Sequence, residues 1–188
     1  MPKALKQDKK AALVAAAIRV FASQGLAAPT AMIAKEADVA NGTLFNNFPT
    51  KTDLLNYVYI QIKQEVIETA IVDSPTDVDL KQQAYHMWSR WTRWGAANPA
   101  KRRTLAILCV SDEISDETRL AAGQGATCIG DILTKIVAAG HLREQPLTFV
   151  NGILEALAGM TIDFMIENPD DANKHSDLGF ETFWRAIS

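Results

Sequence analysis

The amino-acid sequence predicts an all-α protein, with a small three-helix head at the N-terminus followed by a helical bundle, about nine helices in all. Apolar residues recur three and four positions apart through nearly every segment, and the strict alternation typical of strands is scarce. Gly, Pro and capping residues separate these segments at helix-like lengths. We expect the head to span residues 1–55 and the bundle residues 56–188.

The helices of the head are marked by stripes, stops and caps. The first helix carries one apolar stripe, formed by Leu13, Ala17 and Phe21. Gly25 is expected to end it. Thr30 is expected to cap a short second helix, and Asn41 a short third one. Thr50 and Asp53 form a capping box, which predicts a long fourth helix.

Turn signals also divide the bundle into helices. The segment 73–79 is rich in Asp, Ser and Pro, and Pro residues follow polar residues at 98–99, 145–146 and 168–169. Two Ser caps with acidic first turns lie within residues 111–117. We therefore expect helices over about residues 80–97, 99–109, 117–140, 146–168 and 169–187.

The composition excludes several classes of protein. Cys109 and Cys128 are the only cysteines, and no Cys or His lies beside them at zinc-ligand spacing. We expect two buried thiols, no metal and no cofactor. The basic N-terminus lacks the apolar core of a secretory signal, and no apolar run approaches the length of a membrane span. We therefore expect a cytoplasmic protein without a membrane partner.

Charge is distributed unevenly along the chain. Residues 1–51 contain seven Lys/Arg and three Asp/Glu, a net +4, so the remaining residues carry −7 of the total charge of −3. A basic head on an acidic body is typical of a nucleic-acid-binding protein with a separate sensing domain, because only the head must approach phosphate.

The segment from Thr30 to Phe48 satisfies the requirements of a helix-turn-helix. Two short helices are separated by a short turn, and the residues expected to pack inward on the first helix are Ile33, Ala34, Ala37, Val39, Leu44 and Phe48. Asp38 occupies the turn position that usually needs a left-handed backbone, where Gly is most common. We expect this departure to reduce stability.

The outward face of the third helix suits the reading of DNA. Its residues are small, polar or flat: Asn41, Gly42, Thr43, Phe45, Asn46 and Asn47. Asn and Thr can hydrogen-bond to base edges, Gly allows close approach of the backbone, and Phe can contact thymine methyl groups. Lys51 would add its charge to the helix N-terminus that follows. The alternative is a helical hairpin within an ordinary bundle.

The head resembles that of the TetR/AcrR family of repressors. The resemblance is carried by Phe21-Ala-Ser-Gln-Gly25, Ile33-Ala-Lys-Glu-Ala37 and Gly42-Thr-Leu-Phe-Asn-Asn-Phe-Pro-Thr-Lys51. It implies base contacts from Asn41, Gly42, Thr43, Phe45 and Asn47, and backbone contacts from Thr30, Ala40 and Lys51. Phe45 stands where the family usually has Tyr, so that hydroxyl cannot reach a phosphate.

The body resembles that of a multidrug-responsive member of the family, through stretches such as Asn98-Pro-Ala100, Thr161-x-Asp-Phe164 and Leu178-Gly-Phe-Glu181. The resemblance implies a small-molecule effector cavity lined by Tyr59, Trp88, Leu133, Ile136, Asn151 and Leu154. An aromatic cluster, Tyr85, Trp88, Trp91 and Trp94, fits planar or cationic ligands. Core packing is the alternative for each of these rings. Asp163 could balance a cationic ligand, although a solvated or dimer-facing carboxylate is the alternative.

The last two helices are expected to pair with those of a second subunit. Small residues in the first of them, such as Gly152, Ala156 and Gly159, permit close helix approach, and internal packing is the alternative. The sequence thus predicts a homodimeric repressor that binds double-stranded operator DNA and is released by an apolar or cationic effector. A helical interaction module without DNA binding is the competing hypothesis. An enzyme is not expected, because His86, His141 and His175 are scattered and no nucleophile motif is present.

Overall fold

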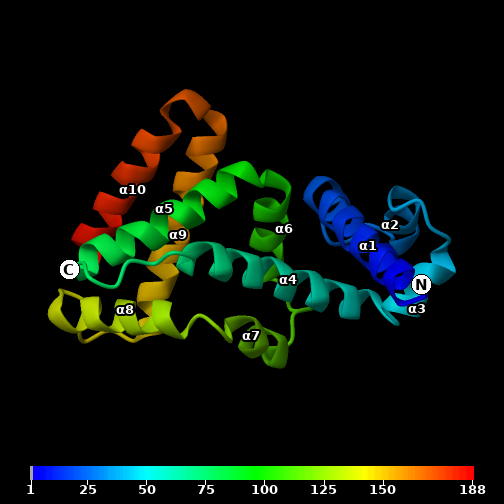
Figure 1. Ribbon diagram of the computed structural model, residues 1–188, viewed down its shortest axis with the longest axis horizontal. Helices are drawn as coiled ribbons and strands as arrows, with labels where there is room; N and C mark the ends of the chain where they lie inside the picture. Colours follow the sequence, from blue (N-terminus) through cyan, green and yellow to red (C-terminus); the bar gives the residue numbers. More distant parts are fainter. Residues whose placement is uncertain (1) are drawn as a thin grey trace. The chain divides into compact units, whose positions relative to one another are not determined.

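The computed structural model describes the backbone of residues 2–188 and the side chains of residues 8–188. This part of the chain forms ten α-helices and one short 3-10 helix, and Figure 1 shows the labelled helices along the chain. Their bounds are α1 Pro2–Gln24, α2 Thr30–Glu36, α3 Asn41–Asn47, α4 Lys51–Ile71, α5 Leu80–Ala97, α6 Pro99–Cys109, α7 Asp116–Gly123, α8 Thr127–Ala139, α9 Leu147–Glu167, η1 Pro169–Asp171 and α10 Ala172–Ile187. The all-α prediction is confirmed.

The chain divides into two compact units. One contains Met1–Gln64 and Ala100–Gly123, and the other contains Glu65–Pro99 and Gln124–Ser188. Helix α4 contributes residues to both units, and α6 and α7 belong almost entirely to the first.

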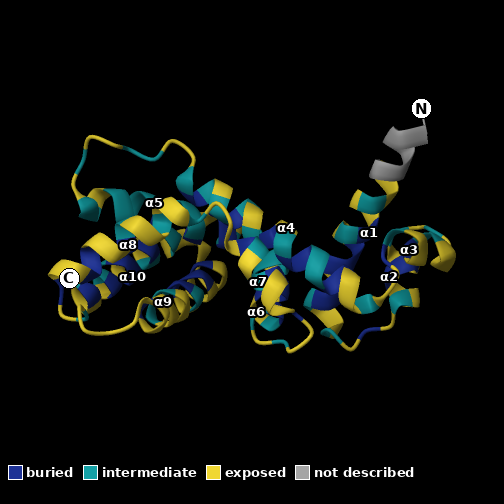
Figure 2. Ribbon diagram, turned by 90° about the horizontal axis from the view of Figure 1, so that it is seen from below, coloured by how far each residue is buried: buried dark blue, intermediate teal, exposed yellow. Residues whose placement is uncertain are grey.

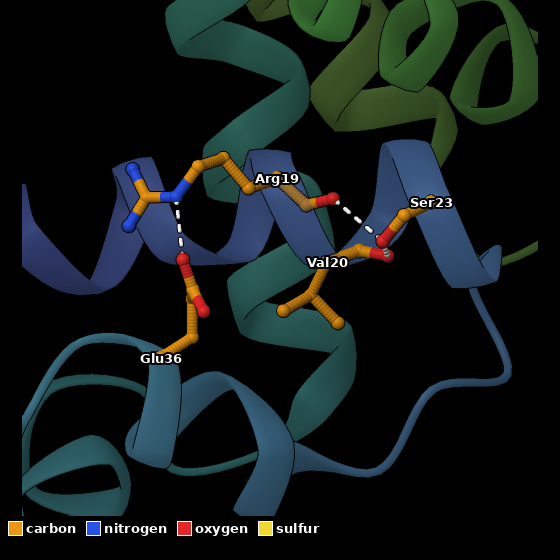
Figure 3. A network of polar contacts seen from close by, with 4 residues as sticks. All are labelled: Arg19, Val20, Ser23 and Glu36. Atoms are coloured by element: carbon orange, nitrogen blue, oxygen red, sulfur yellow. Dashed lines mark hydrogen bonds and ion pairs between the residues drawn. The ribbon is translucent and has the colours of Figure 1, made fainter.

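The core of the first unit is built on α1. The expected stripe is buried, and α2, α3 and α4 add the buried residues Ile33, Leu44, Phe48, Leu54 and Val58. Gly25 ends α1 in the left-handed conformation, with φ of 77°. Arg19 Nε donates to Glu36 Oε1 at 2.7 Å across α1 and α2, and the Ser23 hydroxyl donates to the carbonyl of Arg19 at 3.0 Å (Figure 3). Because the Arg19–Glu36 pair is exposed, we expect it to add less than about 1 kcal/mol.

Helix α6 is fixed to α1 by hydrogen bonds to its backbone. The buried Thr104 hydroxyl donates to the carbonyl of Ile18 at 3.0 Å, and Arg103 Nη1 lies 3.5 Å from the carbonyl of Ala22. These carbonyls belong to the last turns of α1, so α6 is joined to the helix that supports the whole head core.

The core of the second unit is an aromatic and aliphatic cluster from α5, α8, α9 and α10. Its buried members are Trp88, Leu133, Ile136, Val137, Val150, Ala158, Phe180, Phe183 and Ile187. The indole of Trp88 stacks on Phe183, with ring centroids 5.7 Å apart and planes at 12°, and meets Phe180 edge-on at 6.2 Å. Close packing continues at Gly179, where a Cβ atom would collide with Thr161 and Trp88.

Several local predictions were wrong. The expected helix over 117–140 is broken between α7 and α8, where Gly125 has φ of 99°, so the described residues form ten α-helices where about nine were expected. The N-cap positions of α2 and α3 are Pro29 and Ala40, one residue before the expected caps, and neither makes a side-chain cap. Cys128 is exposed rather than buried.

Helix α9 departs from the expectation that no segment reaches membrane-spanning length. By length and composition alone it could cross a membrane, and 33% of its apolar window is buried in the structure. Core helices of water-soluble proteins pass the same test. Figure 2 shows exposed residues along much of α9. Its exposed large apolar residues include Phe149, Met160 and Phe164.

Candidate functional site

Helix α3 presents the face that the sequence predicted. Leu44 and the following Phe48 are buried toward α1, which fixes the rotation of this short helix. On the opposite face Asn41, Gly42, Phe45 and Asn46 are exposed, and Thr43 and Asn47 are half-buried. The side chain of Phe45 is large and apolar, yet it is 42% exposed.

One of the polar side chains on this face is already engaged. Asn47 Nδ2 donates to the carbonyl of Thr43 at 2.8 Å, within α3 itself. One of its two amide N–H donors is therefore used within the helix, which leaves the second N–H and the amide oxygen for base edges.

The turn before α3 has the strained residue that the sequence predicted. Asp38 has φ of 54°, in the left-handed region, and its N–H donates to the carbonyl of Lys35 at 3.1 Å. The N–H of Val39 donates to the carbonyl of Ala34 at 3.0 Å, which closes the turn. The turn therefore holds α3 at a fixed angle to α2 despite the absence of Gly.

The start of α4 supplies a second set of candidate DNA contacts. The capping box is confirmed: the N–H of Thr50 donates to Asp53 Oδ2 at 2.9 Å, and the N–H of Asp53 donates to Thr50 Oγ1 at 3.0 Å. Lys51 is the first residue of α4 and is half-buried, beside helix-terminal amides of the kind that bind phosphate. Of the other two predicted backbone contacts, Thr30 is half-buried and Ala40 is exposed.

The predicted effector residues fall in different environments. Trp88, Leu133 and Ile136 are buried members of the core cluster in the second unit, and Leu154 is partly buried against it. Asn151 is exposed, and Tyr59 is buried within the first unit.

Trp88 has the contacts of a core residue. It is 2% exposed, and its Nε1 donates to the carbonyl of Ser176 at 2.9 Å. Trp94, on the same helix, donates through Nε1 to Glu65 Oε1 at 2.8 Å. The hydroxyl of Tyr85 donates to Asp177 Oδ1 at 2.6 Å. This hydrogen bond is the main cause, and burial the second, of a pKa of Tyr85 above its usual value.

Two further features of the first unit were missed by sequence reasoning. The Lys10 ammonium lies over the rings of Tyr57 and Phe48, and the amide of Asn56 joins α4 to the turn before α7. Tyr57 and Asn56 belong to the same stretch of α4, whose polar and aromatic positions interrupt its apolar stripe. The interruption could have marked Asn56 and Tyr57 as residues with specific contacts. It could not have identified their partners, which lie far away in the sequence.

Among the described residues, no group of three or more His, Cys, Asp and Glu side chains could hold a metal ion. The exposed residues of α3 are mainly polar, whereas large apolar residues are exposed on α9 and α10.

Comparison with known proteins agrees with this arrangement. Residues 13–58 match the family of bacterial regulatory proteins known as the tetR family. A structure from Shewanella sp. PV-4, assigned to the tetR family of transcription regulators, is 29% identical, with 95% of this chain and 97% of that chain covered and a TM-score of 0.85. A tetR family regulator from Marinobacter aquaeolei VT8 has a TM-score of 0.86 at 19% identity, with 98% of each chain covered.

A third similar structure is the transcriptional regulator FadR from Bacillus subtilis, solved in complex with stearoyl-CoA. It is 19% identical, with 95% of this chain and 100% of that chain covered and a TM-score of 0.70. At this identity the likeness concerns the fold alone.

The matched residues 13–58 include all of α2 and α3 and the start of α4, which carry the candidate DNA face. The matched family and these similar structures are described as regulators, and the prediction of a non-enzymatic protein stays a prediction. The helix-turn-helix head thus matches that of the tetR family of regulators, and the whole chain is similar in fold to these proteins.

Proposed function

We propose that this protein is a transcriptional regulator of the TetR type, a repressor that binds operator DNA as a homodimer in the cytoplasm and is released when a small effector binds the body. The observation that carries the proposal is the α3 face, where exposed polar and flat residues are held on a buried apolar anchor at Leu44 and Phe48. The DNA-binding head would be residues 1–55, and residues 56–188 would bind the effector and form the dimer.

In this proposal the residues of the head divide by role. Those that read bases are Asn41, Gly42, Thr43, Phe45, Asn46 and Asn47, and those that approach phosphate are Thr30, Ala40 and Lys51. A base contact and a phosphate contact differ in one measurable respect, because only the base contact depends on sequence.

The proposed DNA contacts can be tested with two variants and one control. We expect Lys51→Ala to weaken binding to every duplex and to lower the slope of log K against log salt by about one. We expect Thr43→Ala to cost about 1–3 kcal/mol on the operator and much less on random DNA. Lys135→Ala, an exposed charge change on α8, should leave both values unchanged. Equal losses on operator and random DNA for Thr43→Ala would contradict the base-reading role.

The proposed dimer uses α9 and α10. Large apolar side chains remain exposed on both helices, notably Phe149, Met160, Phe164 and Leu178. Exposed apolar residues gathered on two neighbouring helices are typical of a subunit interface. We expect Leu178→Asp to convert the dimer to a monomer in light scattering, whereas Leu120→Asp, on α7, should remain dimeric. The two side chains are comparably exposed, at 65% and 75%. A dimeric Leu178→Asp variant would remove α10 from the interface.

The effector is proposed to be planar and apolar or cationic, on the resemblance of the body to the multidrug-responsive repressor RamR. The apolar surroundings of Leu133, Ile136 and Leu154 support an apolar ligand. The stearoyl-CoA bound to the structurally similar FadR supports testing an acyl-CoA beside planar cations. Within the second unit, Asn151 would be the polar group of the site.

A titration distinguishes these effector classes. A planar cationic dye or stearoyl-CoA that quenches tryptophan fluorescence should also release operator DNA in a mobility-shift assay, because an effector acts through its different affinities for the two states. Leu154→Ala should weaken both effects and leave DNA binding without ligand unchanged. A ligand that binds without altering operator affinity would refute the effector proposal and leave the DNA-binding proposal intact.

A further inference from the structure

We infer that Lys10 is an additional DNA-contacting residue, a phosphate-binding cation that Phe48 and Tyr57 hold in place beside the recognition helix α3. The inference rests on the proposed DNA-binding function and adds to it a residue from α1. Neither the helix-turn-helix motif nor the charge count singled out this lysine.

The geometry of the site is an aromatic bracket, formed by the rings of Phe48 and Tyr57. Their centroids lie 5.3 Å apart with planes inclined at 58°. Lys10 Nζ lies 3.8 Å from the centroid of Tyr57 and 5.3 Å from that of Phe48, both within the range of a cation–π interaction. The bracket thus joins α1, the residue after α3 and the second turn of α4.

The bracket lies at the carbonyl end of α3. Phe48 is the C-cap residue of that helix, so Lys10 Nζ lies 5.3 Å from the ring of the residue that ends the recognition helix. A cation at this end also interacts favourably with the helix dipole. The same position is close to Lys51 in the chain, since only Pro49 and Thr50 separate Phe48 from Lys51.

The ammonium keeps its hydrogen-bonding capacity for a further ligand. Aromatic faces attract the charge but supply no lone pair, so the three N–H donors of the lysine are not used up by the rings. Within the described side chains, the charged contacts of Lys10 are with these two rings, and it forms no ion pair with a carboxylate. Lys10 is half-buried, so part of it still faces solvent.

Stability alone does not account for the bracket. The entropy lost when a long lysine side chain is fixed is comparable with the cation–π energy of an exposed pair. A lysine that is already fixed loses less entropy when it binds phosphate, which is the advantage of pre-organisation in binding. The bracket therefore benefits the complex with DNA more than the free protein.

The test compares Lys10→Met with Lys9→Met, in full-length protein. Lys9 is the adjacent residue, is exposed, and undergoes the same change of charge. Binding is measured on the DNA upstream of the protein's own gene and on a random duplex of equal length, over a series of NaCl concentrations. For Lys10→Met we expect the salt slope to fall by about 0.9 and the affinity at about 0.1 M salt to fall about eight-fold on both duplexes. Lys9→Met should retain the wild-type slope.

Two further variants test the bracket itself. Lys10→Arg keeps the charge and the ring contact, so it should retain the slope. Tyr57→Leu keeps the lysine but removes the ring beneath it, and we expect about a two- to five-fold loss of affinity with an unchanged slope. Thermal unfolding of each variant identifies any that is not folded at the assay temperature.

The outcomes separate this inference from the function on which it rests. A wild-type protein that binds neither duplex refutes the DNA-binding function and the role of Lys10 with it. A wild-type protein that binds, with an unchanged slope in Lys10→Met or an equal change in Lys9→Met, refutes the Lys10 contact alone. Wild-type affinity in Tyr57→Leu would show that the ring does not position the lysine.

Discussion

The substitution Trp88→Phe tests whether the aromatic cluster of α5 is core. Three interactions of the indole define its environment: a hydrogen bond from Nε1 to the carbonyl of Ser176 at 2.9 Å, stacking on Phe183, and an edge-on contact with Phe180. The substitution keeps an aromatic ring in place but removes the indole N–H and the volume of the second ring. It should therefore destabilise the protein even when no ligand is present.

The expected loss can be worked out from these contacts. The Ser176 carbonyl lies inside α10 and keeps its helical partner, so the lost hydrogen bond costs about 0.5–1.5 kcal/mol. The smaller ring leaves a cavity and buries less apolar surface, which together cost about 1–2 kcal/mol. The sum, about 1.5–3.5 kcal/mol, is a large part of the total stability of a typical domain, about 5–15 kcal/mol.

Urea denaturation followed by circular dichroism, at one fixed protein concentration, measures this loss. Trp91→Phe is the matched control, because Trp91 is half-buried on the same helix. We expect the control to lose less than about 1 kcal/mol. A loss in Trp88→Phe no greater than in the control would refute the core assignment. If the assignment holds, replacing Trp88 by Ala would weaken the ligand response simply by unfolding the protein. Leu154 is therefore the better position at which to test ligand binding.

The remaining predictions concern strain, ionisation and a side-chain clamp. Asp38→Gly should raise the free energy of unfolding by about 1 kcal/mol in urea, because it relieves the left-handed backbone. The raised pKa of Tyr85 means that its contribution to stability is present below the unfolded pKa of about 10 and is lost as pH rises through the folded pKa. Tyr85→Phe should therefore flatten the decline in unfolding midpoint above about pH 10, and a parallel decline would contradict this. Asn56→Ala should lower stability by about 1–3 kcal/mol and speed hydrogen exchange at Ser115, whereas unchanged exchange would refute the clamp.

The head was predictable from sequence because its determinants are local. The capping box of Thr50 and Asp53, the stop at Gly25 and the left-handed Asp38 each depend on residues within four positions of one another. The same local spacing predicted which residues of α3 are exposed. The caps of α2 and α3 were misplaced by one residue because Pro29 and Ala40 adopt the extended backbone of a cap without a side-chain acceptor.

The environment of the candidate effector residues was not predictable in this way. Trp88 is buried by Ser176, Phe180 and Phe183, nearly ninety positions later in the chain, and periodicity on α5 cannot identify a partner helix. The same applies to Lys10, whose two rings lie about forty residues away. Local patterns determine which face of a helix is buried, whereas the choice between pocket and core depends on long-range packing.

The first unit contains the connections through which a change in the body could reach α3. Asn56 Nδ2 donates to the carbonyl of Glu113 at 2.9 Å, and Asn56 Oδ1 accepts from the N–H of Ser115 at 3.1 Å. Thr52, one turn earlier, donates to Glu113 Oε2 at 2.7 Å. Since Thr104 also joins α6 to α1, residues 104–115 are fixed at both ends to helices of the head. We therefore expect a displacement of α6 either to break these bonds or to carry α1 and the start of α4 with it. Only the second outcome would move α3 relative to DNA, because α3 packs on α2 and α1 and its buried residue Leu44 belongs to the same core as α1.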